Sequence, residues 1–166
     1  MKVIKIPLRY LPKNLSNQDK KKQIKMLAKS KRLYKKGKYY TRKALSSYKN
    51  KPSNHVQNAR KIYNVTNVSP ETLSHVTGCS RASLNKIVKK GEGAYFSSGS
   101  RPNQTAQSWG LARLASSVTG GKSAAVDYNI LEEGCDHHKK AFILANQSKK
   151  KNKYGQRKTQ KNTIYK

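Results

Sequence analysis

One short segment carries the residue types of a nucleotide-binding loop. Thr119-Gly120-Gly121-Lys122-Ser123 ends as a phosphate-binding loop ends, where backbone N–H groups and a lysine hold the phosphates of a nucleotide. The complete pattern also requires a glycine five residues before Gly121, but Ser116 occupies that position, inside a predicted helix. The incomplete pattern argues against nucleotide hydrolysis.

A zinc site is the second chemistry that the side chains suggest. Cys135, His137 and His138 are ligand types that zinc prefers, but they lack a second ligand pair at the usual spacing unless Cys79 joins them. The two cysteines lie far apart in a chain with no secretory signal, which predicts two reduced, buried thiols rather than a disulfide. We expect no metal and no cofactor.

A third group, Ser100, Arg101 and Lys122, could form a phosphate-handling or nuclease-like site. The chain contains only 7 Asp and Glu residues, and no paired carboxylates or Ser/His/Asp arrangement stands out among them. We therefore expect that the protein is not an enzyme, and an enzyme acting on phosphates is the minor alternative.

The charge of the chain is its most informative property. Lys and Arg number 37 against 7 acids, so the formal net charge is +30 and the sequence pI about 10.3. Small soluble domains usually carry a net charge of roughly 2 to 8 in magnitude. An excess of this size needs a polyanionic partner. We expect nucleic acid rather than a membrane, since no apolar run of about 18 residues occurs that could span one.

The charge is unevenly distributed along the chain. Residues 1–66 carry 20 Lys and Arg against one acid, 67–135 carry 7 against 5, and 136–166 carry 10 against one. The pattern predicts a nearly neutral packed domain between two basic extensions. We place a basic helical or extended arm at 1–52, a compact helical domain at 53–145 and a basic disordered tail at 146–166.

Capping signals and apolar spacing predict helices in the basic arm. Ser16 and Asp19 form a partial cap, and the periodicity predicts a helix over 17–36 that ends near Gly37. A weak helix is expected over 42–48 and another over 55–63. The C-terminal tail is too polar to bury the apolar area that would offset the entropy lost on ordering, so we expect it to be disordered.

The most specific local pattern lies at 71–88. Gly78 suits a turn with positive φ, Ser80 can cap a second helix, and Leu84 is spaced to pack back on the first helix. This is the spacing of a helix-turn-helix, within a fold that we expect to be mainly α. Pairs of short helices around a glycine also occur in proteins that never contact DNA, so this alternative stays open.

The second helix of that unit supplies the predicted contacts to nucleic acid. Basic and polar side chains suit phosphates, and Arg81 or Asn85 could reach a base edge. The predicted contacts are Arg81, Ser83, Asn85, Lys86, Lys89 and Lys90, all projecting outward, with Arg101 and the arm residues Lys35, Lys36, Lys38, Arg42 and Lys43. Tyrosines among the lysines, Tyr34, Tyr39, Tyr40 and Tyr48, could stack on bases or pack on protein.

Irregular structure and further helices are expected after this unit. Residues 89–105 are rich in Gly, Ser and Asn, which predicts a loop. A helix capped by Thr105 should then run to Val118 with Trp109 in the core. A short helix or strand should follow over 124–131, stopped by Gly134.

Several blocks of the chain resemble an uncharacterised family of basic proteins from large double-stranded DNA viruses of algae and protists. These blocks are 35–43, 77–80, 90–105 with its Gly-Ser-Arg-Pro-Asn-Gln-Thr module, and 120–128, and the resemblance covers about 8–145. It implies a viral protein of the virion or of the host cytoplasm or nucleus, and it favours DNA over RNA as partner. Such a protein would associate with packaged or replicating DNA. The alternative is a minor capsid protein that lines the inner shell and bridges other capsid subunits.

Overall fold

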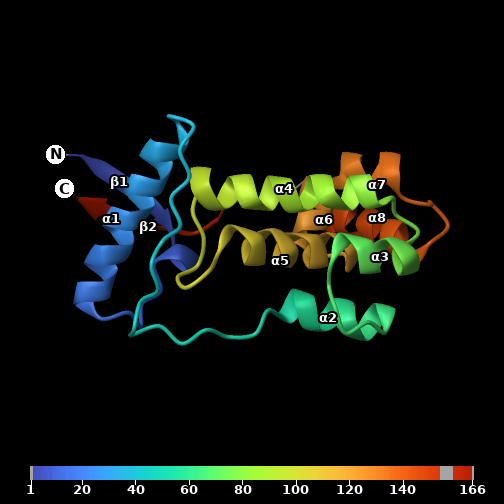
Figure 1. Cartoon of the computed structure of the whole chain (residues 1–166), viewed down its shortest axis with the longest axis horizontal. Coiled ribbons are helices and arrows are strands. Elements are labelled where there is room, and N and C mark those ends of the chain that lie inside the picture. The colour runs from blue at the N-terminus through green and yellow to red at the C-terminus, as the bar shows by residue number, and fades with distance from the viewer. Residues whose placement is uncertain (1, 154–158, 166) are drawn as a thin grey trace. The chain divides into compact units, whose positions relative to one another are not determined.

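The computed structural model describes residues 2–153 and 159–165, and it is mainly α-helical (Figure 1). This confirms the fold class expected from the sequence. The described residues form two compact units, each made from separate stretches of chain. Unit 1 comprises 1–51, 93–106 and 158–166, and unit 2 comprises 52–92 and 107–157.

The two ends of the chain meet in unit 1. Strand β1, Val3–Pro7, pairs antiparallel with strand β2, Lys161–Tyr165, so that Val3 faces Tyr165. The pairing continues past the strand, where the Leu8 N–H donates to the carbonyl of Gln160 at 3.1 Å. The two strands lie beside helix α1 (Figure 1). The expectation of a disordered tail over 146–166 is wrong for 146–152, which are helical, and for 161–165, which form β2, while 154–158 and 166 lie outside the described residues.

Helix α1, Asn17–Tyr34, begins and ends where local signals place it. The Ser16 hydroxyl accepts from the Asp19 N–H at 3.2 Å. Gly37 has φ +69°, and the Lys38 N–H donates to the carbonyl of Leu33 at 2.9 Å, which closes the helix in the manner of a Schellman motif. The predicted end at 36 is two residues too late.

No helix forms over 42–48, contrary to the sequence prediction. The backbone N–H groups there bind side chains from elsewhere instead of forming a helical ladder. The Arg42 N–H donates to the Tyr95 hydroxyl at 2.9 Å, and the Leu45 N–H donates to Oδ1 of Asn103 at 2.6 Å. The Asn103 amide also donates to the carbonyls of Leu45 and Tyr48, so one side chain binds the backbone on both sides of a turn at 46–47.

Unit 2 begins with three helices at predicted places. Helix α2 is Asn54–Tyr63, α3 is Pro70–Thr77 and α4 begins at Arg81. Gly78 takes φ +73° between α3 and α4, and the Ser80 hydroxyl accepts from the Ser83 N–H at 3.2 Å. Three side chains pack in one fully buried cluster, Leu73, Leu84 and Ile87. These three side chains belong to the buried core of unit 2, and both the helix-turn-helix interpretation and its use in DNA recognition stay predictions.

Helix α4, Arg81–Ser97, is much longer than the sequence predicts, and 89–97 is not a loop. One of the glycines that suggested a loop, Gly91, serves close helix packing instead. A methyl group at Gly91 would lie 2.6 Å from Cα of Gly110, which is in helix α5, Ala106–Val118. The two helices approach at this point as only glycines allow.

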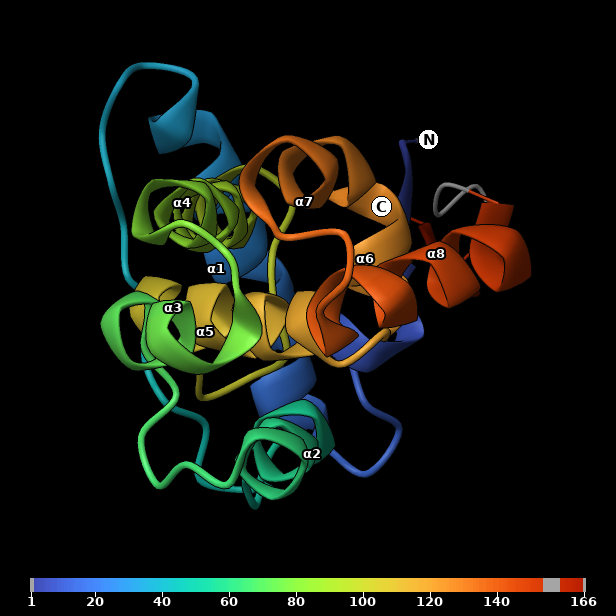
Figure 2. The same ribbon diagram turned by 90° about the vertical axis from the view of Figure 1, so that its right-hand side faces the viewer.

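The remaining helices of unit 2 are α6, Lys122–Val126, α7, Tyr128–Gly134, and α8, Lys140–Asn152. Figure 2 shows α4 and α5 nearly end-on, with α7 beside α4. Asp127, between α6 and α7, is buried and accepts from Arg113 of α5 at 2.9 and 2.7 Å. Trp109 is only partly buried, so the expectation that it anchors the core is wrong.

Cys79 and Cys135 form a disulfide, which corrects the prediction of two reduced thiols. The two residues are partners in an isolated antiparallel bridge. The Ser80 N–H donates to the carbonyl of Gly134 at 2.7 Å, and the Asp136 N–H donates to that of Gly78 at 2.9 Å. Side chains are closest at such a pair, because the hydrogen bonds lie on the neighbouring residues. Sequence spacing gave no sign of this pairing.

Candidate nucleic-acid interface

The positive charge of the chain belongs mainly to unit 1. Its sequence contains 22 Lys and Arg against one acid, a net charge of +21, whereas unit 2 contains 15 against 6, a net charge of +9. The acid of unit 1, Asp19, is buried and accepts two hydrogen bonds from Ser47, which lower the pKa of its carboxyl. The carboxylate also lies 3.8 Å from the ammonium of Lys22, so among the surface cations it mainly offsets Lys22.

Helix α1 presents five of these cations as one stripe. Its buried positions, Asp19, Gln23, Leu27 and Ser30, recur every three or four residues and face the interior. The opposite side carries the exposed residues Lys21, Lys22, Lys25, Lys29 and Arg32, which we call the basic face. Like charges three and four residues apart destabilise a helix by a few tenths of a kcal/mol per pair, and a bound polyanion would relieve that cost.

The basic face was missed by the sequence analysis, although a signal for it existed. Lys21, Lys25 and Lys29 are spaced by four, and Lys25 and Arg32 by seven, so the lysines follow the same 3.6-residue period as the buried side chains. The position of the basic face thus follows from the same helical period as that of the buried side chains.

The loop after α1 is held against the end of α4 by Arg42. The guanidinium donates to the Ser30 hydroxyl and the Tyr95 carbonyl, both at 2.9 Å, and to the Ser100 hydroxyl at 2.8 Å. It lies 3.8 Å from the centre of the Tyr95 ring. Two blocks that are distant in sequence, 35–43 and 90–105, thus meet at one buried cation.

Arg42 is only 7% exposed and has no carboxylate among these partners. Burial lowers the pKa of the guanidinium, while the nearby tyrosines Tyr95, Tyr10 and Tyr40 raise it. Neutral hydroxyls, a carbonyl and an aromatic face therefore solvate the charge. We leave Arg42 out of the proposed interface, because its donors are engaged inside unit 1.

Replacing Arg42 by Lys tests whether the guanidinium fork organises this loop. The substitution keeps the charge but cannot keep three separately directed hydrogen bonds and the ring contact, so we expect a loss of about 2 to 3 kcal/mol in the free energy of unfolding. Urea unfolding followed by near-ultraviolet circular dichroism of the tyrosines measures it. The neighbouring exposed Lys43→Arg is the control and should change stability by less than about 0.5 kcal/mol. Equal effects of the two substitutions would contradict the role given to Arg42.

The other predicted contact residues differ in how far their side chains are exposed to solvent. Lys35, Lys36, Lys38, Lys43 and Arg101 of unit 1 and Arg81, Lys86 and Lys89 of unit 2 are exposed, and Asn85 is half-buried. The expectation that Ser83 projects outward is wrong: a methyl group at Gly134 of α7 would lie 1.8 Å from its hydroxyl oxygen. Lys90 is exposed but lies 3.3 Å from the Asp127 carboxylate.

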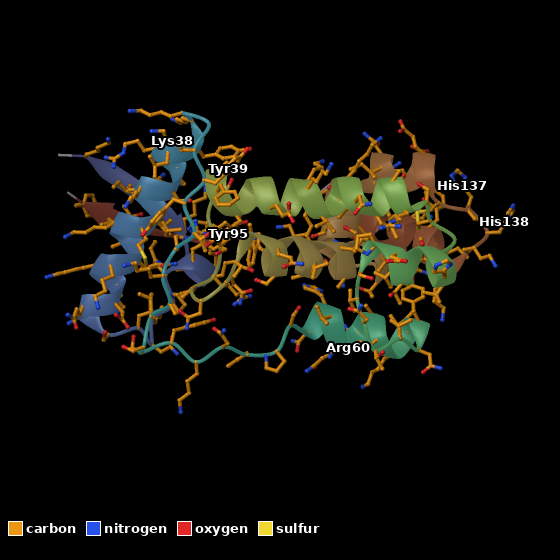
Figure 3. All side chains as sticks on the ribbon, in the orientation of Figure 1. Lys38, Tyr39, Arg60, Tyr95, His137 and His138 are labelled. Carbon is orange, nitrogen blue, oxygen red and sulfur yellow. A yellow bond between two sulfur atoms is a disulfide. The ribbon has the colours of Figure 1, made fainter. Side chains whose placement is uncertain are left out.

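Aromatic rings gather next to the exposed lysines of unit 1. Tyr39 lies 5.1 Å from Phe96 and 6.1 Å from Tyr34, measured between ring centres, and Tyr95 lies 5.0 Å from Phe96. Figure 3 labels Tyr39 beside Lys38 in the loop that follows α1. The Lys29 ammonium lies 4.4 Å from the centre of the Tyr40 ring, which brings this loop next to the basic face.

The segments considered for other chemistry have structural roles here. In the Thr119–Ser123 segment, Gly120 takes φ +73° and the Gly121 N–H donates to the Ser116 carbonyl at 2.8 Å, which makes a turn between two helices. The Ser100 hydroxyl is buried against Arg42. Within residues 2–153 and 159–165, no group of three potential ligands is placed to hold a metal ion. In the same residues no helix has the length and apolarity to span a membrane.

Comparison with known proteins gives a family but no activity. Neither the curated proteins nor the solved structures contain a significant match to this sequence. A family of unknown function, DUF5824, matches over residues 7–140, which include α1, the Arg42 loop and α4. Since the match covers most of the 166 residues, the chain belongs to the DUF5824 family.

Proposed function

We propose that this protein binds nucleic acid through unit 1, with the basic face of α1 as the main contact to phosphates. The observation that carries the proposal is the stripe of five exposed cations, Lys21, Lys22, Lys25, Lys29 and Arg32, in a unit whose single acid is buried. Charge of this density attracts a polyanion at long range and fixes its position at short range.

The dimensions of the stripe suit a nucleic-acid backbone. Lys21 and Arg32 are eleven positions apart on α1, which corresponds to about 16 Å along a helix. A DNA strand in a duplex carries one phosphate per roughly 3.4 Å of axis, so this length spans about five phosphates. Lys35, Lys36 and Lys38 extend the charge past the end of the helix. Eight exposed cations can therefore contact one continuous stretch of backbone.

The biological setting of this binding is a proposal that rests on the sequence resemblance alone. It would make the protein a structural component of a virion that associates with packaged or replicating DNA. The charge distribution is compatible with that role, since phosphate contacts do not depend on base sequence.

Two triple substitutions separate the basic face from the predicted recognition helix. Each removes two lysines and one arginine from an exposed helix surface: Lys21→Gln, Lys25→Gln and Arg32→Gln in α1, against Arg81→Gln, Lys86→Gln and Lys89→Gln in α4. Loss of three phosphate contacts should weaken binding roughly 10²-fold at about 0.1 M salt and make the slope of log K against log salt shallower by about 2.7. We expect this for the α1 variant, measured by fluorescence anisotropy with a labelled duplex.

The α4 variant serves as the matched control for lost charge. Its affinity should fall much less, because only long-range attraction is reduced. If the α4 variant loses more affinity for the duplex than the α1 variant, the interface lies on the helix pair at Gly78 instead of on α1. Equal small losses in both would contradict a localised interface on either helix.

A further inference from the structure

Tyr39 is an aromatic side chain that the fold leaves open to solvent. Its exposed fraction is 72%, the largest of the large hydrophobic side chains in the described part of the chain. The other tyrosines of this segment, Tyr34, Tyr40 and Tyr48, are partly covered. Contacts within the protein therefore cover much of those three rings, but they leave most of the Tyr39 ring available to a ligand.

The Tyr39 ring is exposed yet held in place. It contacts the rings of Phe96 and Tyr34, each at an interplanar angle of 61°, which is an edge-to-face arrangement that aromatic pairs prefer. A ring that is already positioned loses little side-chain entropy when a ligand binds to it.

The backbone on both sides of Tyr39 is also fixed. Before it, the hydrogen bonds from Gly37 to Tyr34 and from Lys38 to Leu33 close the end of α1. After it, Arg42 binds Tyr95 through both its backbone N–H and its guanidinium. Only residues 39–41 lie between Lys38 and Arg42, so the loop holds Tyr39 on a short segment that is fixed at both ends.

Exposed lysines flank Tyr39 in the sequence. Lys35, Lys36 and Lys38 precede it and Lys43 follows it, all exposed. A purely apolar protein partner would have to bury these ammonium groups at a cost in desolvation. A ligand that offers a flat aromatic face together with closely spaced anions matches the chemistry of the site better.

We propose that Tyr39 stacks on an unpaired base of a single-stranded nucleic acid whose phosphates are bound by Lys35, Lys36 and Lys38. The proposal rests on the proposed function and adds to it a contact that only single strands can make. In a duplex the bases already stack on one another, so the ring gains no base face without opening the helix. A positively charged surface with aromatic side chains is the arrangement that proteins use to bind single strands.

Binding of an oligothymidylate and of a duplex to Tyr39→Ala, Tyr39→Phe and wild-type protein tests the proposal. We expect Tyr39→Ala to weaken single-strand binding by about 5- to 100-fold, the usual range for one stacked base, and to leave duplex binding within about twofold. Tyr39→Phe keeps the ring and should retain wild-type affinity for both. Tyr165→Ala removes another tyrosine of unit 1, 65% exposed on β2, and should change neither affinity.

A single strand that lacks bases isolates the stacking contribution. Wild-type protein should bind this abasic strand no more tightly than Tyr39→Ala binds the oligothymidylate, and Tyr39→Ala should bind both strands equally, which completes a double-mutant cycle. Equal losses for single strand and duplex, or loss of affinity for the abasic strand in Tyr39→Ala, would overturn the role of Tyr39.

The two proposals fail in distinguishable ways. If wild-type protein binds single strand and duplex and Tyr39→Ala changes neither, the stacking inference is wrong and the proposed function stands. If wild-type protein binds neither at low salt, the proposed function itself is wrong, and the inference falls with it.

Discussion

Raising the salt concentration from 50 to 200 mM is expected to weaken binding of DNA by about 10³- to 10⁵-fold. That range applies to proteins that contact six to ten phosphates, because each contact releases condensed counterions and the gain shrinks as bulk salt rises. The basic face and the exposed lysines after it supply eight cations, Lys21, Lys22, Lys25, Lys29, Arg32, Lys35, Lys36 and Lys38. Anisotropy titrations at four or more salt concentrations give the slope directly.

The same titrations distinguish a defined interface from diffuse attraction. Heparin is a polyanion without bases and serves as the competitor. If heparin displaces an oligothymidylate at equal charge concentration, phosphate contacts alone account for binding. If heparin does not displace the oligothymidylate at equal charge concentration, the bases contribute to the affinity, as the stacking by Tyr39 requires. A nearly flat salt dependence up to 0.3 M would contradict the phosphate interface altogether.

Features set by neighbouring residues were predictable from the sequence. The start of α1 follows from Ser16, whose hydroxyl needs only a backbone N–H three residues on. The turn between α3 and α4 follows from Gly78, since the left-handed conformation favours glycine. Such signals depend on a few adjacent residues, so a single sequence contains all the information they need.

Features set by distant residues were not predictable in this way. Gly91 suggested a loop because glycine weakens a helix locally, while the residue that it approaches closely, Gly110, lies about twenty residues away in sequence. Arg42 counted as a surface charge because nothing beside it in sequence indicates burial, and its partners Tyr95 and Ser100 follow 53 and 58 residues later.

The location of the positive charge in the fold also depends on residues that are distant in sequence, and it was not predictable from the sequence. Segment sums assigned it to two separate arms, but β1 and β2 join the chain ends in one sheet, with Val3 opposite Tyr165. The cations of the basic face lie on a folded helix, which holds them at fixed spacing, whereas a free arm would not. Fixed spacing is what allows the basic face to be tested by substitution at particular residues.

Reducing the disulfide between Cys79 and Cys135 should destabilise unit 2 by about 4 kcal/mol, or roughly 10³-fold in its unfolding equilibrium, if the bond acts mainly on the entropy of the unfolded chain. The bond closes a loop with a sequence separation of 56 residues. This loop contains α4, α5, α6 and α7, so the constraint acts on most of the buried cluster of the unit.

Urea unfolding with and without reductant measures this effect, followed by the fluorescence of Trp109, the single tryptophan of the chain, which lies in unit 2. The double substitution Cys79→Ala and Cys135→Ala should unfold at the same urea concentration in both conditions, close to that of the reduced wild-type protein. The chain has only two cysteines, so no alternative internal pairing can compensate. A reductant-independent wild-type midpoint would show that the bond does not form in solution. In that case the hydrogen bonds flanking the pair, from Ser80 to Gly134 and from Asp136 to Gly78, would have to hold the two segments together without it.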